Sequence, residues 1–301
     1  MTAVDTTTVA PAVTPLRRFW RAFSSSRTAI VGLALLSCIV LLALFAPFIA
    51  PQDPYDLMQL DLLDGRLPPG SASATGIIYW LGTDDQGRDM LSGILYGLRI
   101  SLGVGICSAA AAAAIGASLG LVAAYAGGRI EAGLMRLVDL QLSFPTILIA
   151  LMILAFLGKG VINVVLALIL VEWASYARTA RASALVERRK EYVEAATAMG
   201  AGPFRILFRH LLPNCLPPLM VIMTVQVARA IALEATLSFL GLGVPITEPS
   251  LGLLIANGYQ YMLSGKFWIS FYPGLALLVT VVAINLVGDH LRDVLNPRRQ
   301  A

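Results

Sequence analysis

Two kinds of residue in this sequence are candidates for catalysis: a serine nucleophile and two histidines. The segment Gly116-Ala117-Ser118-Leu119-Gly120 matches the G-x-S-x-G pattern of serine hydrolases. That pattern needs a strand before the serine and a helix after it, whereas here it lies within an apolar run. His210 and His290 have no cysteine or second histidine at metal-ligand spacing. The sequence therefore predicts no catalytic residue and no metal site, and we expect His210 on a helix surface or in a packing contact.

The glycines of this region suit helix packing rather than phosphate binding. Ala112, Gly116 and Gly120 recur every four residues, so they share one helix face that a second helix can approach closely. No G-x-x-x-x-G-K-[ST] segment occurs, so the chain holds no nucleotide phosphates in a P-loop. Any energy from ATP must therefore come from another subunit.

Three ionisable residues fall inside apolar stretches, where charge is costly and usually functional. Arg229 and Glu234 are five residues apart, about 140° around a helix, so they are not an ideal pair on one helix. They are candidates for lining a transport pathway, with pairing inside a helix bundle or an interfacial position as the alternatives. Glu172 is expected near the cytoplasmic end of a short span, where its side chain can extend toward water.

The composition indicates an integral membrane protein. Apolar residues make up 57% of the 301 residues, charged residues only 13%, and the mean hydropathy is +0.77. Soluble proteins carry roughly a quarter charged residues. Cys38, Cys107 and Cys215 lie within or beside apolar spans and are expected to act as small hydrophobic residues. We interpret the net charge of +4 through its distribution over the loops, and no nucleic-acid partner is expected.

The apolar stretches predict an all-α membrane protein with six transmembrane helices and both termini in the cytoplasm. This orientation places sixteen Lys and Arg residues on the cytoplasmic side and five outside, in keeping with the positive-inside rule. The third and fourth spans are short, and a re-entrant segment there is an alternative. The expected spans are Thr28–Ala50, Ser101–Tyr125, Leu142–Leu157, Val161–Tyr176, Cys215–Leu240 and Phe267–Val287.

The spans divide the chain into regions, of which the outer loop is acidic. Asp84, Asp85, Arg88 and Asp89 lie in this loop. Docking of a soluble partner and simple solvation explain its charge equally well. The regions are a cytoplasmic tail at 1–27 with a short interfacial helix at Leu16–Phe23, the first span at 28–50, an extracytoplasmic loop at 51–100, a five-helix core at 101–287 with a cytoplasmic loop at 178–214, and a cytoplasmic tail at 288–301.

The most ordered polar segment is the stretch Glu191–Asn214, which the topology places in the cytoplasm. Its first part has helix-forming residues, and the glycines at 200 and 202 interrupt them. Pro203 is typical of the first residue of a new helix. We expect this second helix to end at Leu212, because Pro213 cannot continue it.

This segment resembles the EAA loop of permease subunits of ATP-binding-cassette importers. The resemblance rests on Glu194-Ala195-Ala196, Gly200 and Leu212-Pro213, and the ending His210-Leu-Leu-Pro-Asn214 is similar to the peptide-transport branch. Three further segments resemble the C-type permease of dipeptide and oligopeptide importers, so the resemblance covers nearly the whole chain. They are Leu81–Asp89, Leu237–Gly243 and Gly288–Asp293.

The resemblance implies a type I importer permease in a bacterial inner membrane, in contact with membrane lipid. It implies pairing with a B-type permease, two ATPase subunits that bind ATP and Mg, and an extracytoplasmic binding protein that delivers di- or oligopeptides. The chain itself would then be a transport subunit without a cofactor and not an enzyme. The residues expected in the ATPase-coupling loop are Glu191, Glu194, Ala195, Ala196, Gly200, Arg205, His210, Leu212 and Pro213.

Other functions remain open at this point. Relatives with the same permease motifs carry nickel, glutathione or other small solutes. A secondary transporter that works without ATPases should show broken helices with charge at the membrane midplane and internal symmetry, neither of which is evident in the sequence. An intramembrane hydrolase needs Ser118 within reach of a histidine, but both histidines are expected at the cytoplasmic edge.

Overall fold

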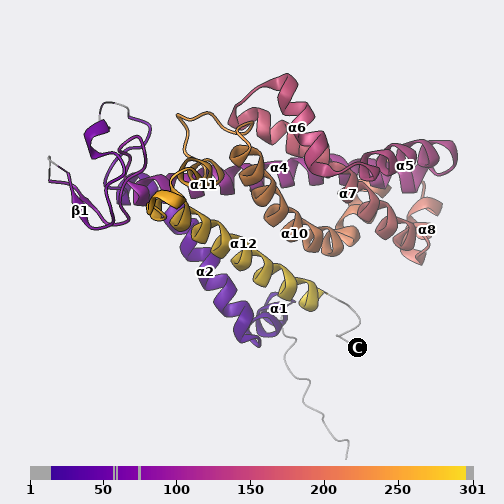
Figure 1. Cartoon of the computed structure of the whole chain (residues 1–301). Helices are drawn as coiled ribbons and strands as arrows, with labels where there is room; N and C mark the ends of the chain where they lie inside the picture. The colour runs from indigo at the N-terminus through magenta and orange to yellow at the C-terminus, as the bar shows by residue number, and fades with distance from the viewer. Residues whose placement is uncertain (1–14, 57, 59, 74–75, 296–301) are drawn as a thin grey trace, which may run out of the picture.

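Helices form most of the chain in the computed structural model, which describes residues 15–56, 58, 60–73 and 76–295 (Figure 1). The short helix expected near the N-terminus is present as α1. One small hairpin lies in the outer loop, where β1 and β2 pair antiparallel, Ser71 opposite Tyr79. The elements are α1 (Pro15–Ser24), α2 (Arg27–Leu44), α3 (Ala46–Ile49), η2 (Leu62–Asp64), β1 (Ser71–Ala72), β2 (Ile78–Tyr79), α4 (Met90–Ala126), α5 (Gly128–Ser143), α6 (Thr146–Leu157), α7 (Val161–Glu187), α8 (Glu191–Ala198), α9 (Pro203–Arg205), η3 (Ile206–Leu211), α10 (Leu212–Phe239), α11 (Leu251–Tyr259), η4 (Met262–Ser264) and α12 (Trp268–Leu295).

Five helical segments of the described chain are long and apolar enough to cross a membrane, and a bent pair, α5 with α6, gives a sixth if it is counted as one span. The pair is bent by 92°. The expected third span, Leu142–Leu157, is wrong because the helix breaks inside it. Pro145 restricts Phe144 to an extended conformation, φ −96° and ψ 146°, so α5 ends there and α6 starts afresh.

Three other spans are longer than the sequence predicted, and one of them, α12, continues to Leu295 rather than ending at Val287. α4 begins at Met90 rather than Ser101, and α7 continues to Glu187 rather than ending near Tyr176. Hydropathy detects only the part of a helix that lies in hydrocarbon. Packing against neighbouring helices extends these helices into the aqueous regions.

The helix leaving the cytoplasmic loop also runs further than expected. α9, η3 and α10 join into one segment, Pro203–Phe239, so the predicted end at Leu212 is wrong. η3 is a π-helical stretch in which the Leu212 N–H donates to the Leu207 carbonyl. A wide turn of this kind accommodates the ring and the missing N–H of Pro213 without ending the helix.

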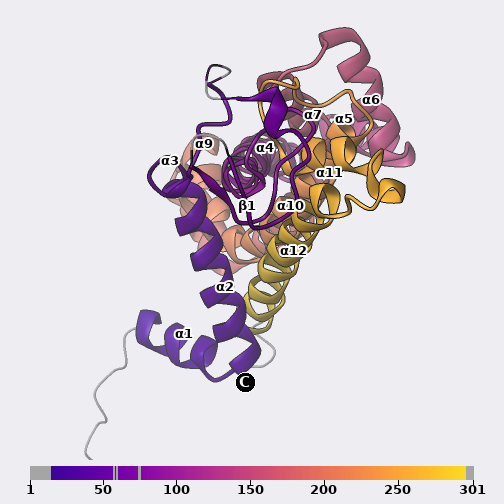
Figure 2. The ribbon, with the colours of Figure 1, turned by 60° about the vertical axis from the view of Figure 1, so that its left-hand side comes forward.

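Contacts between segments distant in sequence bring together loops that the predicted topology places on the same side of the membrane. At one end, Arg188 Nη1 donates to the Ala124 carbonyl at 2.8 Å. At the other end, the Gly160 N–H donates to the Gly243 carbonyl at 3.1 Å. The His290 ring lies 3.3 Å from the Ala22 carbonyl, which holds α1 against the end of α12. Figure 1 shows β1 far from α8, and Figures 1 and 2 both show α2 beside α12.

The packing of α4 on α7 is the closest contact between two long helices. A Cβ atom on Gly116 would lie 2.7 Å from the Tyr176 Cβ, and one on Gly120 would lie 2.8 Å from the Ala180 Cβ. Both would also collide with backbone carbonyls of α7. The sequence prediction of a small-residue packing face is therefore confirmed, and Ala112, at 0% exposed, belongs to it.

We expect Gly120→Ala to destabilise the protein by about 1–3 kcal/mol, since the added methyl must separate α4 from α7. The matched control is Gly103→Ala on the same helix, where a Cβ meets nothing within 4 Å. Thermal unfolding in detergent should show a lower midpoint for Gly120→Ala and an unchanged or slightly higher one for Gly103→Ala. Equal midpoints for the two variants would contradict this account of the helix contact.

Candidate functional site

The cytoplasmic loop consists of two helices joined at Gly200, as predicted. Gly200 has φ +78°, a left-handed conformation that favours glycine. The Ala201 N–H donates to the Ala196 carbonyl and the Gly200 N–H to the Thr197 carbonyl, each at 3.0 Å. These two bonds form a Schellman motif that ends α8 in a defined direction. The turn into α9 is therefore fixed by backbone hydrogen bonds.

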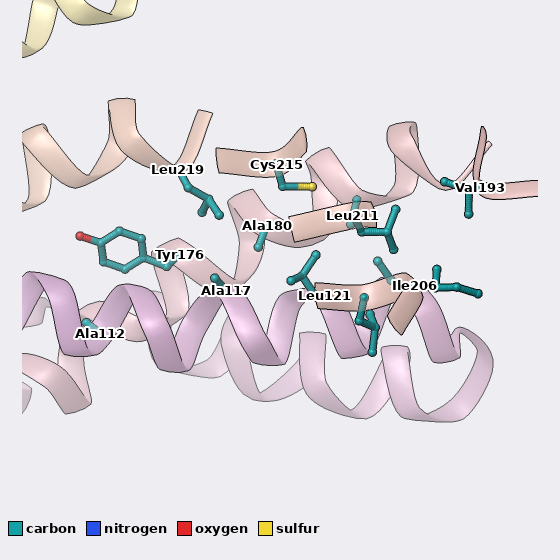
Figure 3. Packing of buried hydrophobic residues seen from close by; sticks show 13 residues of the cluster. Ala112, Ala117, Leu121, Tyr176, Ala180, Val193, Ile206, Leu211, Cys215 and Leu219 are labelled. Carbon is teal, nitrogen blue, oxygen red and sulfur yellow. The ribbon is translucent and has the colours of Figure 1, made fainter. Parts of the chain in front are cut away.

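The inner face of this loop is built into the helix bundle (Figure 3). Val193 of α8 and Ile206 and Leu211 of η3 are 4%, 0% and 0% exposed. They join one cluster with Leu121 of α4 and Ala180 of α7. Because protein interiors are close-packed, a displacement of the loop is transmitted to these helices.

The outer face of the loop is apolar and exposed. Met199 is 81% exposed and Phe204 is 74% exposed, and Ala195 and Ala198, which precede them on α8, are also exposed. Phe204 packs on Phe208 with ring centroids 4.6 Å apart. Large apolar side chains exposed together mark an interaction surface. We call Ala195, Ala198, Met199, Phe204 and Phe208 the docking face.

The predicted loop residues divide between the two faces. Ala196, at 2% exposed, points into the protein and is not part of the docking face. His210 is half-buried, and its carbonyl accepts from Asn214 Nδ2 at 2.7 Å, so the packing role expected of it is consistent with the structure. The others lie at the surface or at its edge: Glu191, Glu194, Arg205 and Pro213 are exposed, and Leu212 is half-buried.

Charged residues just before α8 form hydrogen bonds that hold the start of the cytoplasmic loop in place. Glu187 accepts from Lys190 Nζ at 2.6 Å and from the Tyr192 hydroxyl at 2.8 Å. Burial, together with the hydrogen bond to Glu187, raises the pKa of Tyr192 to about 12. The hydroxyl therefore stays protonated and remains a donor at neutral pH. Arg188 also stacks over the Tyr125 ring, 5.7 Å from its centroid.

Three charged residues of the outer loop are buried and hold the loop together, so they are not exposed to a binding partner. Asp84 and Arg88 form an ion pair of 2.9 Å with side chains 0% and 3% exposed. Arg88 Nη1 also donates to the Ile246 carbonyl at 3.1 Å, which ties this loop to the α10–α11 connection. Asp89 caps α4 by accepting from the Ser92 N–H at 2.8 Å, and its own N–H donates to Gln52 Oε1. Neither earlier explanation, docking nor solvation, therefore accounts for Asp84, Arg88 and Asp89.

The charge of Asp85 is poorly compensated, because no ion pair or side-chain hydrogen bond of the described chain holds it. Its Oδ1 is buried and accepts no hydrogen bond. Burial raises the pKa of Asp85, and the nearby Asp84 carboxylate adds to the rise. The charged form of Asp85 is thus less stable in the folded protein than in the unfolded chain.

Glu234 is held inside the bundle, one of the alternatives considered from the sequence. It is 0% exposed and accepts from Ser101 Oγ at 2.9 Å and from Ser238 Oγ at 2.8 Å. Ser101 belongs to α4, so these bonds tie α4 to α10. A buried carboxylate with partners of this kind is a structural link between helices.

Glu172 and Arg229 line a second polar region, a cavity of about 260 Å³ where α6, α7 and α10 meet. Glu172 is 4% exposed and lies fifteen residues before the end of α7, so its side chain does not extend toward water as expected. That expectation failed because α7 is eleven residues longer than predicted. Arg229 is exposed on α10 and bonds to Gln226 Oε1 at 3.2 Å. We call this cavity the polar hollow; its lining residues are Thr146, Glu172, Arg229, Ala232, Leu233 and Thr236.

Several residues of these regions carried no signal in the sequence. Ser101, Gln52 and Thr146 matter because of distant residues that the fold brings to them. Thr146 alone had a local cue, since it directly follows a proline that interrupts an apolar run. Ser118 donates to the Ala114 carbonyl at 2.7 Å in the middle of α4, so it does not stand on a strand-to-helix turn.

Comparison with known proteins identifies the family. Residues 116–301 match the family described as binding-protein-dependent transport system inner membrane component, and residues 14–69 match the N-terminal transmembrane domain of oligopeptide transport permease C. The chain belongs to this family. It is a multi-pass inner-membrane permease subunit of an ABC transporter complex, it is not an enzyme, and a partner ATPase binds the ATP. The secondary-transporter and hydrolase alternatives are thereby set aside.

Relatives match over almost the whole chain. The dipeptide transport system permease protein of Haemophilus influenzae is 40% identical over 285 residues, 95% of each chain. The di/tripeptide transport system permease protein of Pseudomonas aeruginosa is 40% identical over 94% of this chain and 92% of its own. The glutathione transport system permease protein of Pectobacterium atrosepticum is 37% identical over 95% and 92%.

A solved structure shares the fold. A chain from inward-facing conformations of the MetNI methionine ABC transporter matches with a TM-score of 0.56 and 22% identity. The match covers 69% of this chain and 98% of that one. It confirms the predicted ABC importer permease fold.

We expect Gly200→Val to open the turn between α8 and α9, because a β-branched residue at positive φ costs about 1–3 kcal/mol. Gly200→Asn is the matched control, since asparagine tolerates the left-handed conformation and a Cβ there meets nothing within 4 Å. Hydrogen exchange at the amides of Gly200 and Ala201 should accelerate in the valine variant only. Equal protection in both variants would argue against a turn that depends on glycine.

We expect Asp85 to lower the stability of the protein as pH rises above the ordinary aspartate pKa of about 3.9. The pKa of Asp85 is raised in the folded state, so the folded protein binds more protons in this window and stability falls with increasing pH. Asp85→Asn should remove this loss and unfold at a higher temperature at pH 7, with the difference shrinking toward pH 4. Asp61→Asn, which replaces an exposed aspartate of the same loop, should leave the pH dependence unchanged. Parallel pH curves for wild type and Asp85→Asn would refute the assignment.

Proposed function

We propose that this chain pairs with a B-type permease, receives di- or oligopeptides from an extracytoplasmic binding protein, and is driven by two ATPase subunits. The observation that carries the substrate class is 40% identity to dipeptide and di/tripeptide permease proteins over nearly the full length. Glutathione is the second candidate, supported by the 37% identity to a glutathione permease protein. Glutathione is itself a modified peptide, so the two candidates share their chemistry.

We propose further that the docking face is where an ATPase subunit binds. Its apolar side chains lie on a rigid turn, and the opposite side of the same turn is packed into α4 and α7. Aromatic side chains that fill a partner's pocket dominate the energy of many interfaces. Phe204 is suited to that role because it is exposed and already supported by Phe208. Exposed Glu194 and Arg205 would add polar contacts at the rim.

Motion of the ATPases would then reach the membrane through this loop. Val193, Ile206 and Leu211 leave little room for the loop to move independently of the bundle. The Schellman motif at Gly200 keeps α8 and α9 in a fixed relation. We infer that the loop acts as a rigid lever between the ATPases and the spans.

The substrate is tested by uptake into proteoliposomes that hold the complete transporter, with the binding protein added outside. We expect ATP-dependent uptake of a labelled dipeptide, inhibited by excess unlabelled dipeptide and not by nickel ions. Competition by glutathione stronger than by dipeptides would favour the second candidate. Absence of peptide uptake by an intact, ATP-hydrolysing complex would overturn the proposed substrate class.

The ATPase contact is tested by Phe204→Ser. We expect this variant to fold with an unchanged thermal midpoint, because Phe204 is exposed, and to lose about 30-fold in affinity for the ATPases, as for an interface residue worth about 2 kcal/mol. Co-purification of the ATPases and coupled uptake should fall together. Phe156→Ser is the matched control, an 86% exposed phenylalanine of α6 on the opposite side of the membrane. Undiminished ATPase retention in Phe204→Ser would exclude this docking face.

A further inference from the structure

Counted from the outer ends of its helices, the polar hollow is expected near the middle of the membrane. Glu172 is 11 residues from the outer end of α7 at Val161, and Arg229 is 10 residues from the outer end of α10 at Phe239. At 1.5 Å per residue both lie about 15–17 Å from the outer ends of their helices. Half the thickness of the hydrocarbon core is about 15 Å. Two opposite charges therefore sit at similar depth on neighbouring helices.

These two charges interact only at a distance and make no direct contact. Within the described chain no ion pair joins Glu172 to Arg229, and Glu172 Oε2 is buried without a hydrogen-bond partner. Arg229 is exposed and bonds only weakly, at 3.2 Å, to Gln226. Charge at this depth is not tolerated against lipid, so this face of α10 must meet protein or a water-filled cavity. Within this chain, the hollow therefore offers one acidic and one basic side chain that have no charged group in contact with them.

A broken helix adds a third polar element. α6 begins at Thr146, on the edge of the hollow, directly after the 92° bend. Its first turn has no side-chain cap, so the positive end of a 12-residue helix faces this region. Arg229 and the start of α6 together favour an anion. Glu172 favours a cation at the same site.

We propose that the polar hollow binds the charged ends of the transported peptide, the carboxylate at Arg229 and the start of α6, and the ammonium at Glu172. This inference rests on the proposed function, which supplies a peptide as cargo. Every unmodified peptide is a zwitterion, and two extended residues span at most about 7 Å, a length suited to a cavity of 260 Å³. Ala232 and Leu233 supply the apolar part of the lining, which makes no specific demand on peptide side chains. Recognition of the termini alone allows peptides of many sequences to pass.

The arginine and glutamate have separable roles in this proposal. An arginine holds a carboxylate by two parallel hydrogen bonds, which a lysine does not reproduce. Removing the charge of Arg229 should weaken binding of a peptide with a free C-terminus and leave a C-terminally amidated peptide unaffected. Removing the charge of Glu172 should act in the same way on the free N-terminus. Each prediction pairs one variant with one change in the ligand.

The experiment measures equilibrium binding of labelled alanyl-alanine, its N-acetyl form and its C-terminal amide to the complete transporter in nanodiscs without the binding protein. Wild type should bind the unmodified dipeptide at least about 10-fold more tightly than either derivative. Arg229→Gln should lose the preference over the amide but keep the preference over the N-acetyl form, and Glu172→Gln should do the reverse. Arg229→Lys should fall between wild type and Arg229→Gln. Absence of saturable binding to wild type, or equal losses for all three ligands, would overturn the proposal.

Uptake assays with the binding protein present separate this inference from the proposed function. Ser118→Ala is the control, because Ser118 lies on α4 outside the polar hollow. If wild type and Ser118→Ala transport no peptide, the proposed function fails. If they transport peptide and both charge variants transport it equally well, the proposed function stands and the binding site fails. Loss of assembly or of ATP hydrolysis in the charge variants would assign the pair to contact with the second permease and would also reject the site.

Discussion

The close approach of α4 to α7 is the constraint on which the rest of this structure depends. Because Gly116 and Gly120 have no side chains, the backbone of α4 lies directly against the backbone carbonyls and Cβ atoms of α7. In a membrane there is little hydrophobic gain from joining helices, so dense van der Waals packing has to hold them. The cluster that includes Leu121 and Ala180 continues this contact to the cytoplasmic loop. The loop is therefore an extension of the helix pair and not an appendage to it.

Two neighbouring glutamates illustrate how the surroundings of a residue decide its role. Glu234 is surrounded by serine hydroxyls from its own helix and from α4, which satisfy its carboxylate. Glu172 has a buried oxygen without a partner, beside a cavity and near a helix break. Both are acidic residues in apolar stretches, and the sequence alone did not show which of them has partners inside the bundle. Much of the difference comes from residues far away along the chain, such as Ser101 for Glu234 and Arg229 for Glu172.

The outer loop shows the reverse relation between charge and exposure. Acidic residues in a loop normally suggest solvation, yet Asp84 and Asp89 are buried. Asp84 organises Arg88, and Arg88 reaches the connection after α10. Asp89 starts α4, whose length then reaches the cytoplasmic side. The single helix α4 thus connects the outer loop to the cytoplasmic loop.

The sequence by itself determined the class of protein, the helical fold, the alignment of the small-residue face and the turn at Gly200. These features follow from local rules, namely length of apolar runs, four-residue spacing and the backbone preferences of glycine and proline. Tertiary structure alone decided where α7 ends, how Pro213 continues within a helix, that Ala196 faces inward, and that the buried Glu172 lines a cavity together with Arg229. Each of these depends on contacts between segments distant in sequence. Their energies depend on packing and burial, which no local pattern of residue types records.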